Sequence, residues 1–266
     1  MQCKKIKRTA YRGSNNIMKV IHFYGCSFTA GDELSDYEYP ELANHTTQET
    51  YWPARLEFLD HEQQRYEYLE KNRQKAYPAK VAAKDFETIN FAQNGASLDE
   101  MIYTIIMNLS QVPEKKPDAV FLQIPPMYRE AVFFDQQPCI ATIRYTNVVP
   151  KEMNDSKYHD YMTSRIMTFT DAHFAISDLL KLYSLKCFLD SKNIPFYLIE
   201  MMDELQIRYS FIKSNLYNHI TDKLKIIPIL NIAPIVRTTE NSVCLAGHFT
   251  EKIHEIISNK IVEILD

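Results

Sequence analysis

One short run of the sequence sets strong limits on the fold. Residues 119–124 (Ala-Val-Phe-Leu-Gln-Ile) are nearly all apolar, with Pro117 ahead of them and Pro125-Pro126 directly behind. A central strand of a parallel sheet is covered on both faces and reads as a continuous apolar run of this kind. Proline then ends the strand, because it has no backbone N–H to donate to a neighbour. The run therefore predicts a buried parallel sheet.

Other segments extend this sheet by alternating apolar runs with helical patterns. The expected strands are residues 19–25, 86–91, 119–124, 196–199 and 226–230. The expected helices are residues 52–71, 77–84, 98–110, 170–191, 203–224 and 251–265, with a hairpin or meander near 139–149. Such alternation predicts a doubly wound α/β fold with a parallel sheet of about five strands. Ligands bind such sheets at the carboxyl ends of the strands, where the strand order reverses.

The length of 266 residues fits a single α/β domain, predicted here over residues 18–266, with insertions at about 32–75 and 127–168. The first insertion follows the first strand and is rich in aromatic residues. It fits either a substrate-binding wall or lid, or a stabilising excursion packed by its own aromatic side chains. Residues 1–17 are basic and precede a second possible start at Met18, so a flexible extension is predicted there.

Composition argues against several classes of protein. The formal net charge of −4 argues against a dominant electrostatic surface for nucleic acid. Five cysteines are widely spaced without a Cys-x-x-Cys pair, which favours a reducing compartment over a disulfide framework or a zinc site. No apolar run is long enough to span a membrane, and no apolar signal region precedes Val20. We expect a cytoplasmic protein without a metal or other cofactor.

Glycine marks the candidate site. Only five glycines occur in the chain, against a usual content of roughly 7%. Gly25 and Gly31 flank Ser27 at the end of the first strand, and Gly247 precedes His248. A serine between a strand and a helix exposes its hydroxyl near helix N-terminal amides, which stabilise an oxyanion. The alternatives are that Ser27 only caps a helix and that His248 has a structural role; neighbouring Cys26 is less well placed as a nucleophile.

Three segments resemble the sequence blocks of the SGNH (GDSL) hydrolases, a family of esterases and deacetylases. Residues 25–31 (Gly-Cys-Ser-Phe-Thr-Ala-Gly) resemble the nucleophile block, and residues 90–97 (Asn-Phe-Ala-Gln-Asn-Gly-Ala-Ser) resemble the second block. Residues 246–250 (Ala-Gly-His-Phe-Thr) resemble the last block. The likeness is strongest to small, phage-type members that begin Gly-Cys-Ser-Phe-Thr. It implies a flavodoxin-like three-layer α/β/α fold, with Ser27 as nucleophile, His248 as base and the Gly95 amide in the oxyanion hole.

Two family positions differ in this chain. Leu245 and Ala246 stand where the resemblance requires the triad aspartate, and the segment after residue 124 lacks the family's asparagine donor. Side chains that can replace this donor by position are Gln123, Arg129 and Asn94. A backbone carbonyl, or an acid from elsewhere such as Glu240, can orient the imidazole instead. The sequence therefore predicts a Ser27–His248 dyad.

The resemblance implies a serine esterase or deacetylase that cleaves a small ester, such as an O-acetylated carbohydrate, through an acyl-Ser27 intermediate. Neither a membrane nor nucleic acid is an expected partner. The alternative is a catalytically weak or inactive protein of the same fold that binds a glycan or serves as a structural component, for example of a virion. For a viral protein, the expected location is the host cytoplasm or the virion.

Overall fold

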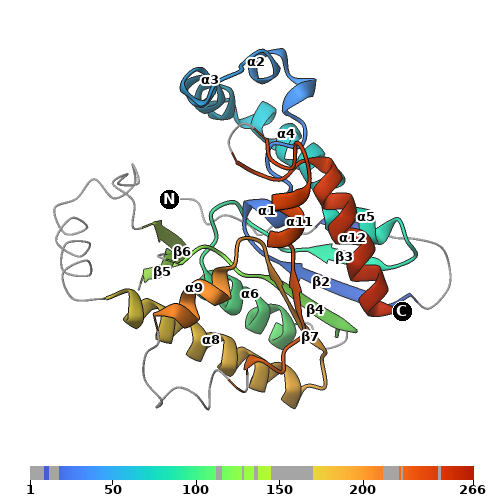
Figure 1. Cartoon of the computed structure of the whole chain (residues 1–266), viewed down its shortest axis with the longest axis vertical. Coiled ribbons are helices and arrows are strands. Elements are labelled where there is room, and N and C mark those ends of the chain that lie inside the picture. Colours follow the sequence, from blue (N-terminus) through green and yellow to red (C-terminus); the bar gives the residue numbers. More distant parts are fainter. Residues whose placement is uncertain are drawn as a thin grey trace.

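The computed structural model describes residues 9–11, 18–111, 116–127, 129–134, 137–144, 170–211, 222, 224–244 and 247–266. Side chains are described in these ranges except for residues 9–11 and 129–144. Figure 1 shows a central sheet with helices on both of its faces and a group of helices that projects beyond it.

The main sheet has the strand order β1-β3-β2-β4-β7-β8. Its strands are β1 (Thr9–Tyr11), β2 (Val20–Tyr24), β3 (Glu87–Asn90), β4 (Ala119–Gln123), β7 (Phe196–Glu200) and β8 (Ile229–Asn231). Within the described part of this sheet, β1 and β3 are the antiparallel pair, and the other five strands run parallel in the order second, first, third, fourth, fifth. This flavodoxin-like order confirms the predicted fold class. The order reverses between β2 and β4, which is where such sheets bind ligands.

Helices form the two outer layers (Figure 1), with α5 and α12 on one face of the sheet and α6 and α8 on the other. The helices of the described residues are α1 (Ser27–Ala30), the 3-10 helix η1 (Asp36–Glu38), α2 (Pro40–Ala43), α3 (Gln48–Asp60), α4 (Glu62–Lys75), α5 (Tyr77–Ala82), α6 (Leu98–Gln111), α8 (Asp171–Ser191), α9 (Glu204–Ser210), α11 (Ala233–Thr238) and α12 (Glu251–Leu265). Among these, no helix combines the length and apolar character needed to cross a bilayer.

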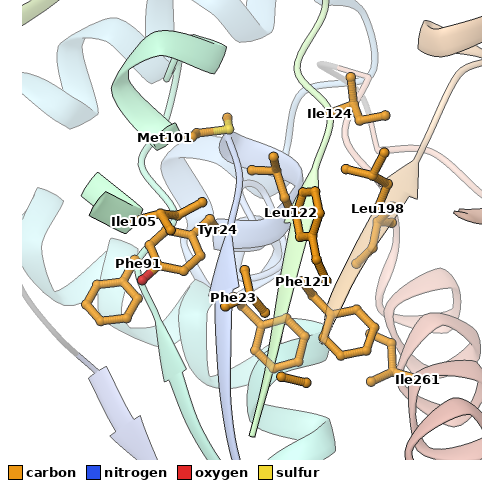
Figure 2. Packing of buried hydrophobic residues seen from close by; sticks show 14 of the residues in the cluster. Phe23, Tyr24, Phe91, Met101, Ile105, Phe121, Leu122, Ile124, Leu198 and Ile261 are labelled. Carbon is orange, nitrogen blue, oxygen red and sulfur yellow. The ribbon is translucent and has the colours of Figure 1, made fainter. Parts of the chain in front are cut away.

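The core lies on both faces of the sheet, because successive side chains of a strand point to opposite sides. Phe23 contacts the ring of Tyr77 in α5, with ring centroids 5.6 Å apart, and stacks on Phe121 at 5.4 Å. Tyr24 points to the other face, where it stacks on Phe91 at 4.9 Å, and Ile105 of α6 belongs to the same core cluster (Figure 2). All but Phe91 of these side chains are almost fully buried. The double coverage is what the apolar runs predict.

Residues 36–75 leave the sheet after β2 as an excursion built from η1, α2, α3 and α4 (Figure 1). The excursion has its own small core, which consists of Leu42, Tyr51, Phe58 and Tyr68. The single helix expected over residues 52–71 is instead two helices, because His61 adopts an extended backbone between α3 and α4. The aromatic side chains of this core therefore pack the excursion itself, as expected for a stabilising excursion.

Other segments differ from the sequence expectations at the edges. Residues Thr9–Tyr11, expected within a flexible extension, pair with β3 as an edge strand. The hairpin expected near 139–149 is formed by β5 (Arg129–Phe134) and β6 (Gln137–Arg144), a separate two-stranded sheet. Of the helix expected over 203–224, α9 covers the start, and residues 212–221 lie outside the described residues.

Candidate active site

The turn after β2 is shaped by two glycines. Gly25 leaves no room for a side chain, since an added Cβ would lie 2.0 Å from the Thr29 hydroxyl oxygen. Cys26 is extended, and Ser27 then begins the single-turn helix α1, whose four residues are all buried. Gly31 ends this turn in the left-handed conformation with φ of 77°, which favours glycine. The serine hydroxyl is thereby held at the carboxyl end of a central strand.

Ser27 and His248 meet, although they come from opposite ends of the chain. Ser27 Oγ lies 2.8 Å from His248 Nε2, within hydrogen-bonding distance. The histidine follows Gly247 in a loop that is closed by the bridge between Val243 and Phe249. The ring of Phe28 packs 5.1 Å from the imidazole, and the His248 side chain is 15% exposed. The structure thus brings together the two residues that the sequence motifs single out.

A carboxylate also contacts this histidine, and it comes from Glu33. Its Oε2 lies 2.6 Å from His248 Nδ1 and accepts the backbone N–H of His248 at 3.0 Å. The Glu33 side chain is fully buried. Because the carboxylate accepts from Nδ1–H, Nε2 carries the lone pair that faces the Ser27 hydroxyl. The predicted two-residue arrangement therefore has a third member.

Sequence reasoning missed Glu33 because it searched near the histidine. Residues 245 and 246, where the family resemblance requires the triad aspartate, lie outside the described residues. Glu240, the other acid considered, is exposed. Glu33 directly follows Gly31-Asp32, at the start of the insertion predicted over residues 32–75. Its backbone has φ of 71°, which is uncommon for a residue other than glycine and turns its side chain back toward the site. The signal was an acidic pair at the end of the nucleophile turn.

Gly95 lies in the loop after β3, next to the turn that begins at Ser27. The Gln93 N–H donates to the Gly25 carbonyl at 3.1 Å, which ties the two loops together. Asn94 and Gly95 occupy the middle of a turn closed by the Ala96 N–H and the Gln93 carbonyl, and Gly95 has φ of 80°. Gly95 is buried, whereas Asn94 is exposed. The loop is thus placed beside the Ser27 turn, and Asn94 lies at its solvent side.

Gln123 lies inside the sheet. Its Oε1 accepts the Cys26 N–H at 3.0 Å and faces the Thr29 hydroxyl at 3.3 Å. Its Nε2 donates to the Ile124 carbonyl at 2.6 Å, and the residue is fully buried. These contacts make Gln123 a support for the turn that begins at Ser27, which differs from its expected role as an oxyanion donor. Arg129 belongs to β5, and its side chain lies outside the described residues.

Charged side chains cluster around the imidazole. Asp32 Oδ2 lies 3.9 Å from His248 Nε2, and Asp32 Oδ1 accepts from Arg55 Nη2 at 2.6 Å. Burial and the charge of Glu33 raise the pKa of the nearby Cys244 thiol to about 12, so it stays protonated at neutral pH. Within the described residues, no group of three or more His, Cys, Asp or Glu side chains is arranged to hold a metal ion.

Comparison with known proteins identifies similar folds. No family model and no curated protein matches the sequence. Among solved structures, TesA aligns with 93% of this chain and 98% of its own at 10% identity and a TM-score of 0.50. The two chains share a fold. A lipolytic protein of the G-D-S-L family from Desulfitobacterium hafniense aligns with 92% of this chain and 99% of its own, at 10% identity and a TM-score of 0.49. An acetylxylan esterase from Geobacillus stearothermophilus aligns with 92% of this chain and 93% of its own, at 12% identity and a TM-score of 0.40.

Proposed function

We propose that the protein is a serine esterase or deacetylase of the SGNH type that cleaves a small ester, such as an O-acetyl group on a carbohydrate. The observation that carries the proposal is the line of contacts from the Ser27 hydroxyl to His248 Nε2 at 2.8 Å and from Nδ1 to Glu33 at 2.6 Å. A hydroxyl, an imidazole and a carboxylate in this order activate a nucleophile on several unrelated folds.

In the first half of the reaction, Ser27 Oγ attacks the ester carbonyl carbon while its proton passes to His248 Nε2. Glu33 stabilises the imidazolium that forms and keeps the ring in the required orientation. When the tetrahedral intermediate collapses, the bond to the leaving alkoxide breaks and Nε2 returns its proton to that oxygen. The products are a free alcohol and an ester of Ser27.

In the second half, a water molecule attacks the acyl carbon and gives its proton to Nε2. The bond to Ser27 Oγ then breaks, the serine recovers the proton, and a carboxylic acid leaves. The negative oxygen of both intermediates needs donors, and we assign this role to the backbone N–H groups of Ser27 and Gly95. The contact between Gln93 and Gly25, which fixes one loop against the other, supports the assignment. One such donor is worth about 10²–10³ in rate.

The alternative, a non-catalytic glycan-binding or structural protein, drew on two missing family residues. Glu33 now supplies a carboxylate on the histidine, which removes one of these two arguments. The substrate class itself rests on the family resemblance of the sequence motifs.

The test compares the wild type with Ser27→Ala in two assays, labelling by a fluorophosphonate probe and release of acetate from p-nitrophenyl acetate and acetylated xylan. Ser184→Ala is the matched control. Ser184 is exposed on α8, and its hydroxyl donates to the Leu180 carbonyl of the same helix at 2.9 Å. We expect labelling and turnover in the wild type and the control, and neither in Ser27→Ala. Equal signals in all three proteins, or none in the wild type, would favour the non-catalytic alternative.

A further inference from the structure

Among the described residues, two side-chain oxygens lie within 4 Å of His248 Nε2. Besides the Ser27 hydroxyl at 2.8 Å, Asp32 Oδ2 lies 3.9 Å away. The Asp32 side chain is 7% exposed, so water screens its charge poorly. An unpaired carboxylate there would attract a proton to Nε2. A protonated Nε2 cannot accept the proton of Ser27, and the base of the proposed reaction would be blocked.

In the structure, Asp32 is paired with Arg55. Its Nη2 donates to Asp32 Oδ1 at 2.6 Å, and its side chain is 4% exposed. A charged hydrogen bond of this length holds one oxygen of the carboxylate and balances its charge. We propose, on the basis of the proposed function, that Arg55 is a positioning residue that keeps Asp32 from binding the proton at His248 Nε2 and so keeps the base free for Ser27.

The excursion of residues 36–75 holds Arg55 in place. Arg55 lies on α3, and its guanidinium carbon is 5.5 Å from the ring centroid of Trp52 and 5.9 Å from that of Tyr68. Nη2 also donates to the Tyr68 hydroxyl at 3.4 Å, and Tyr68 in turn donates to Asp36 at 2.6 Å. The aromatic excursion therefore has a role beyond its own packing, since it supplies the cation that faces the candidate site.

The charges around the imidazole can be counted element by element. Glu33 and Asp32 approach from the loop after α1, and His254 interacts with the imidazole from α12. Arg55 of α3, Asp36 of η1 and Cys244 of the histidine's own loop interact with these two carboxylates. Cys244 stays neutral, and burial lowers the pKa of His254 to about 3, so it too is neutral near pH 7. Arg55 is thus the one cation among these groups. Its removal leaves two carboxylates facing the imidazole.

The experiment measures the titration midpoint of His248 by NMR in a Ser27→Ala background, where no catalysis is needed. Replacing the arginine (Arg55→Met) should raise the midpoint by about one pH unit or more, because an opposite charge within reach favours the protonated form. Removing the carboxylate (Asp32→Asn) should lower it, and the double variant should lie between the two. Arg65→Met is the control, since it removes an equal charge from an exposed position on α4.

With Ser27 present, the same substitutions are read in the pH dependence of kcat/KM for p-nitrophenyl acetate. Arg55→Met should move the acid limb of the profile upward, and adding Asp32→Asn should move it back. If Arg55→Met does not fold, Asp32→Asn and the double variant still decide, since the double variant buries no unpaired charge. A midpoint unmoved by Asp32→Asn, or equally moved by Arg65→Met, overturns the inference. Absence of turnover in the wild type would refute only the proposed function, because the titration does not depend on it.

Discussion

Glu33 is a residue other than glycine in the left-handed region, and this one backbone state directs its carboxylate to His248. Such a conformation costs on the order of 1–3 kcal/mol and persists where its surroundings fix it. Here Glu33 Oε2 accepts two hydrogen bonds from His248, one from Nδ1 and one from the backbone N–H. At the scale of a residue, a strained backbone thus accompanies the contact that orients the imidazole.

The substitution Glu33→Gln tests the role of the charge, because glutamine keeps the shape of the side chain and an oxygen that can accept from Nδ1–H. We expect kcat to fall roughly 10⁴-fold, as it does when the carboxylate of a serine protease triad is lost. The measurement is turnover of p-nitrophenyl acetate, with the melting temperature recorded to confirm folding. Glu33→Asp, which keeps the charge on a shorter side chain, should retain more activity than Glu33→Gln. An unchanged kcat in Glu33→Gln would show that His248 acts without this acid.

The substitution Gly25→Ala tests the close approach at the nucleophile turn. The new Cβ would lie 2.0 Å from Thr29 Oγ1 and 2.6 Å from Thr29 Cβ, so the turn must shift. Overpacking of this kind costs about 1–3 kcal/mol, and we expect at least this loss in the free energy of unfolding measured in urea. Gly247→Ala serves as the comparison, since its Cβ would meet no atom within 4 Å and only backbone strain remains. A larger loss for Gly247→Ala would contradict the steric explanation.

Local motifs sufficed to single out Ser27 and His248, because each stands in a recognisable turn next to a glycine. The acid could not be found in the same way. Its position depends on a left-handed backbone at Glu33, and the letters Asp32-Glu33 alone do not distinguish a turned-back carboxylate from a solvated one. The same holds for Gln123, which sequence reasoning placed at the site edge because it lies near a strand end, whereas its amide is used inside the sheet.

At the scale of elements, the break between α3 and α4 was invisible in the sequence. Asp60-His61-Glu62 contains neither glycine nor proline, the residues that usually mark a helix end. The two helices separate because Tyr51 and Phe58 of α3 and Tyr68 of α4 pack into one small core. Tertiary packing therefore set an end that propensity did not predict. By contrast, α12 was predicted with its observed limits, since its apolar face repeats at helical spacing.

Arg208 joins three elements, and its removal should destabilise all of them. The side chain is 1% exposed, donates to Asp178 of α8 at 2.7 and 2.9 Å, and donates to the Pro125 carbonyl beyond β4 at 3.0 Å. Arg208→Met leaves buried Asp178 with only the more distant Lys181, 3.9 Å away, as a cation among the described residues. We therefore expect a loss of about 3–5 kcal/mol in the free energy of unfolding. Urea unfolding followed by circular dichroism measures it.

The matched control is Arg237→Met, which removes an arginine from an ion pair with Asp203 whose arginine side chain is 64% exposed. Such a pair contributes about 0–1 kcal/mol. Similar losses in the two variants would mean that burial does not determine the strength of the Arg208 contact.

At the scale of the whole molecule, the sheet was predicted best where it is most buried. Strands β2, β4 and β7 lie at its centre and read as apolar runs, whereas the edge strands carry weaker signals. Strand β8 begins at Ile229, later than the expected residue 226, and both its ends are exposed. Strand β1 was not predicted at all, because Thr9–Tyr11 is short and stands among basic residues.

His254 makes the stability of the molecule depend on pH. It is buried in α12 and accepts the Tyr77 N–H of α5 at 3.1 Å, and burial lowers its pKa from 6.5 to about 3. Between these values the unfolded chain binds a proton that the folded chain does not, so the folded state loses stability as the pH falls. The expected slope from this group is about 1.4 kcal/mol per pH unit.

The measurement is the free energy of unfolding in urea at several pH values between about pH 7 and pH 5, for the wild type and His254→Asn. Asparagine keeps an acceptor for the Tyr77 N–H but does not titrate. The wild type should therefore lose stability faster than the variant as the pH falls. Burial raises the pKa of Asp36 and Asp178, which has the opposite effect on how stability changes with pH. Both proteins contain these two groups, so their contribution cancels when the two stability curves are subtracted. Parallel curves would exclude His254 as the cause.

The proposed acid and nucleophile share one short segment, since Glu33 lies two residues beyond Gly31, which ends the turn that Ser27 begins. Their relative position is therefore set by local backbone contacts, such as the Asp32 N–H to the Ser27 carbonyl at 3.0 Å, and requires no long-range closure of the chain. His248, in contrast, lies 221 residues from Ser27 in the sequence and joins them only when its loop docks. The proposed relay thus depends on one long-range contact, between the turn that begins at Ser27 and the histidine loop. A displacement of that loop would break the hydrogen bonds of His248 to Ser27 and to Glu33 together.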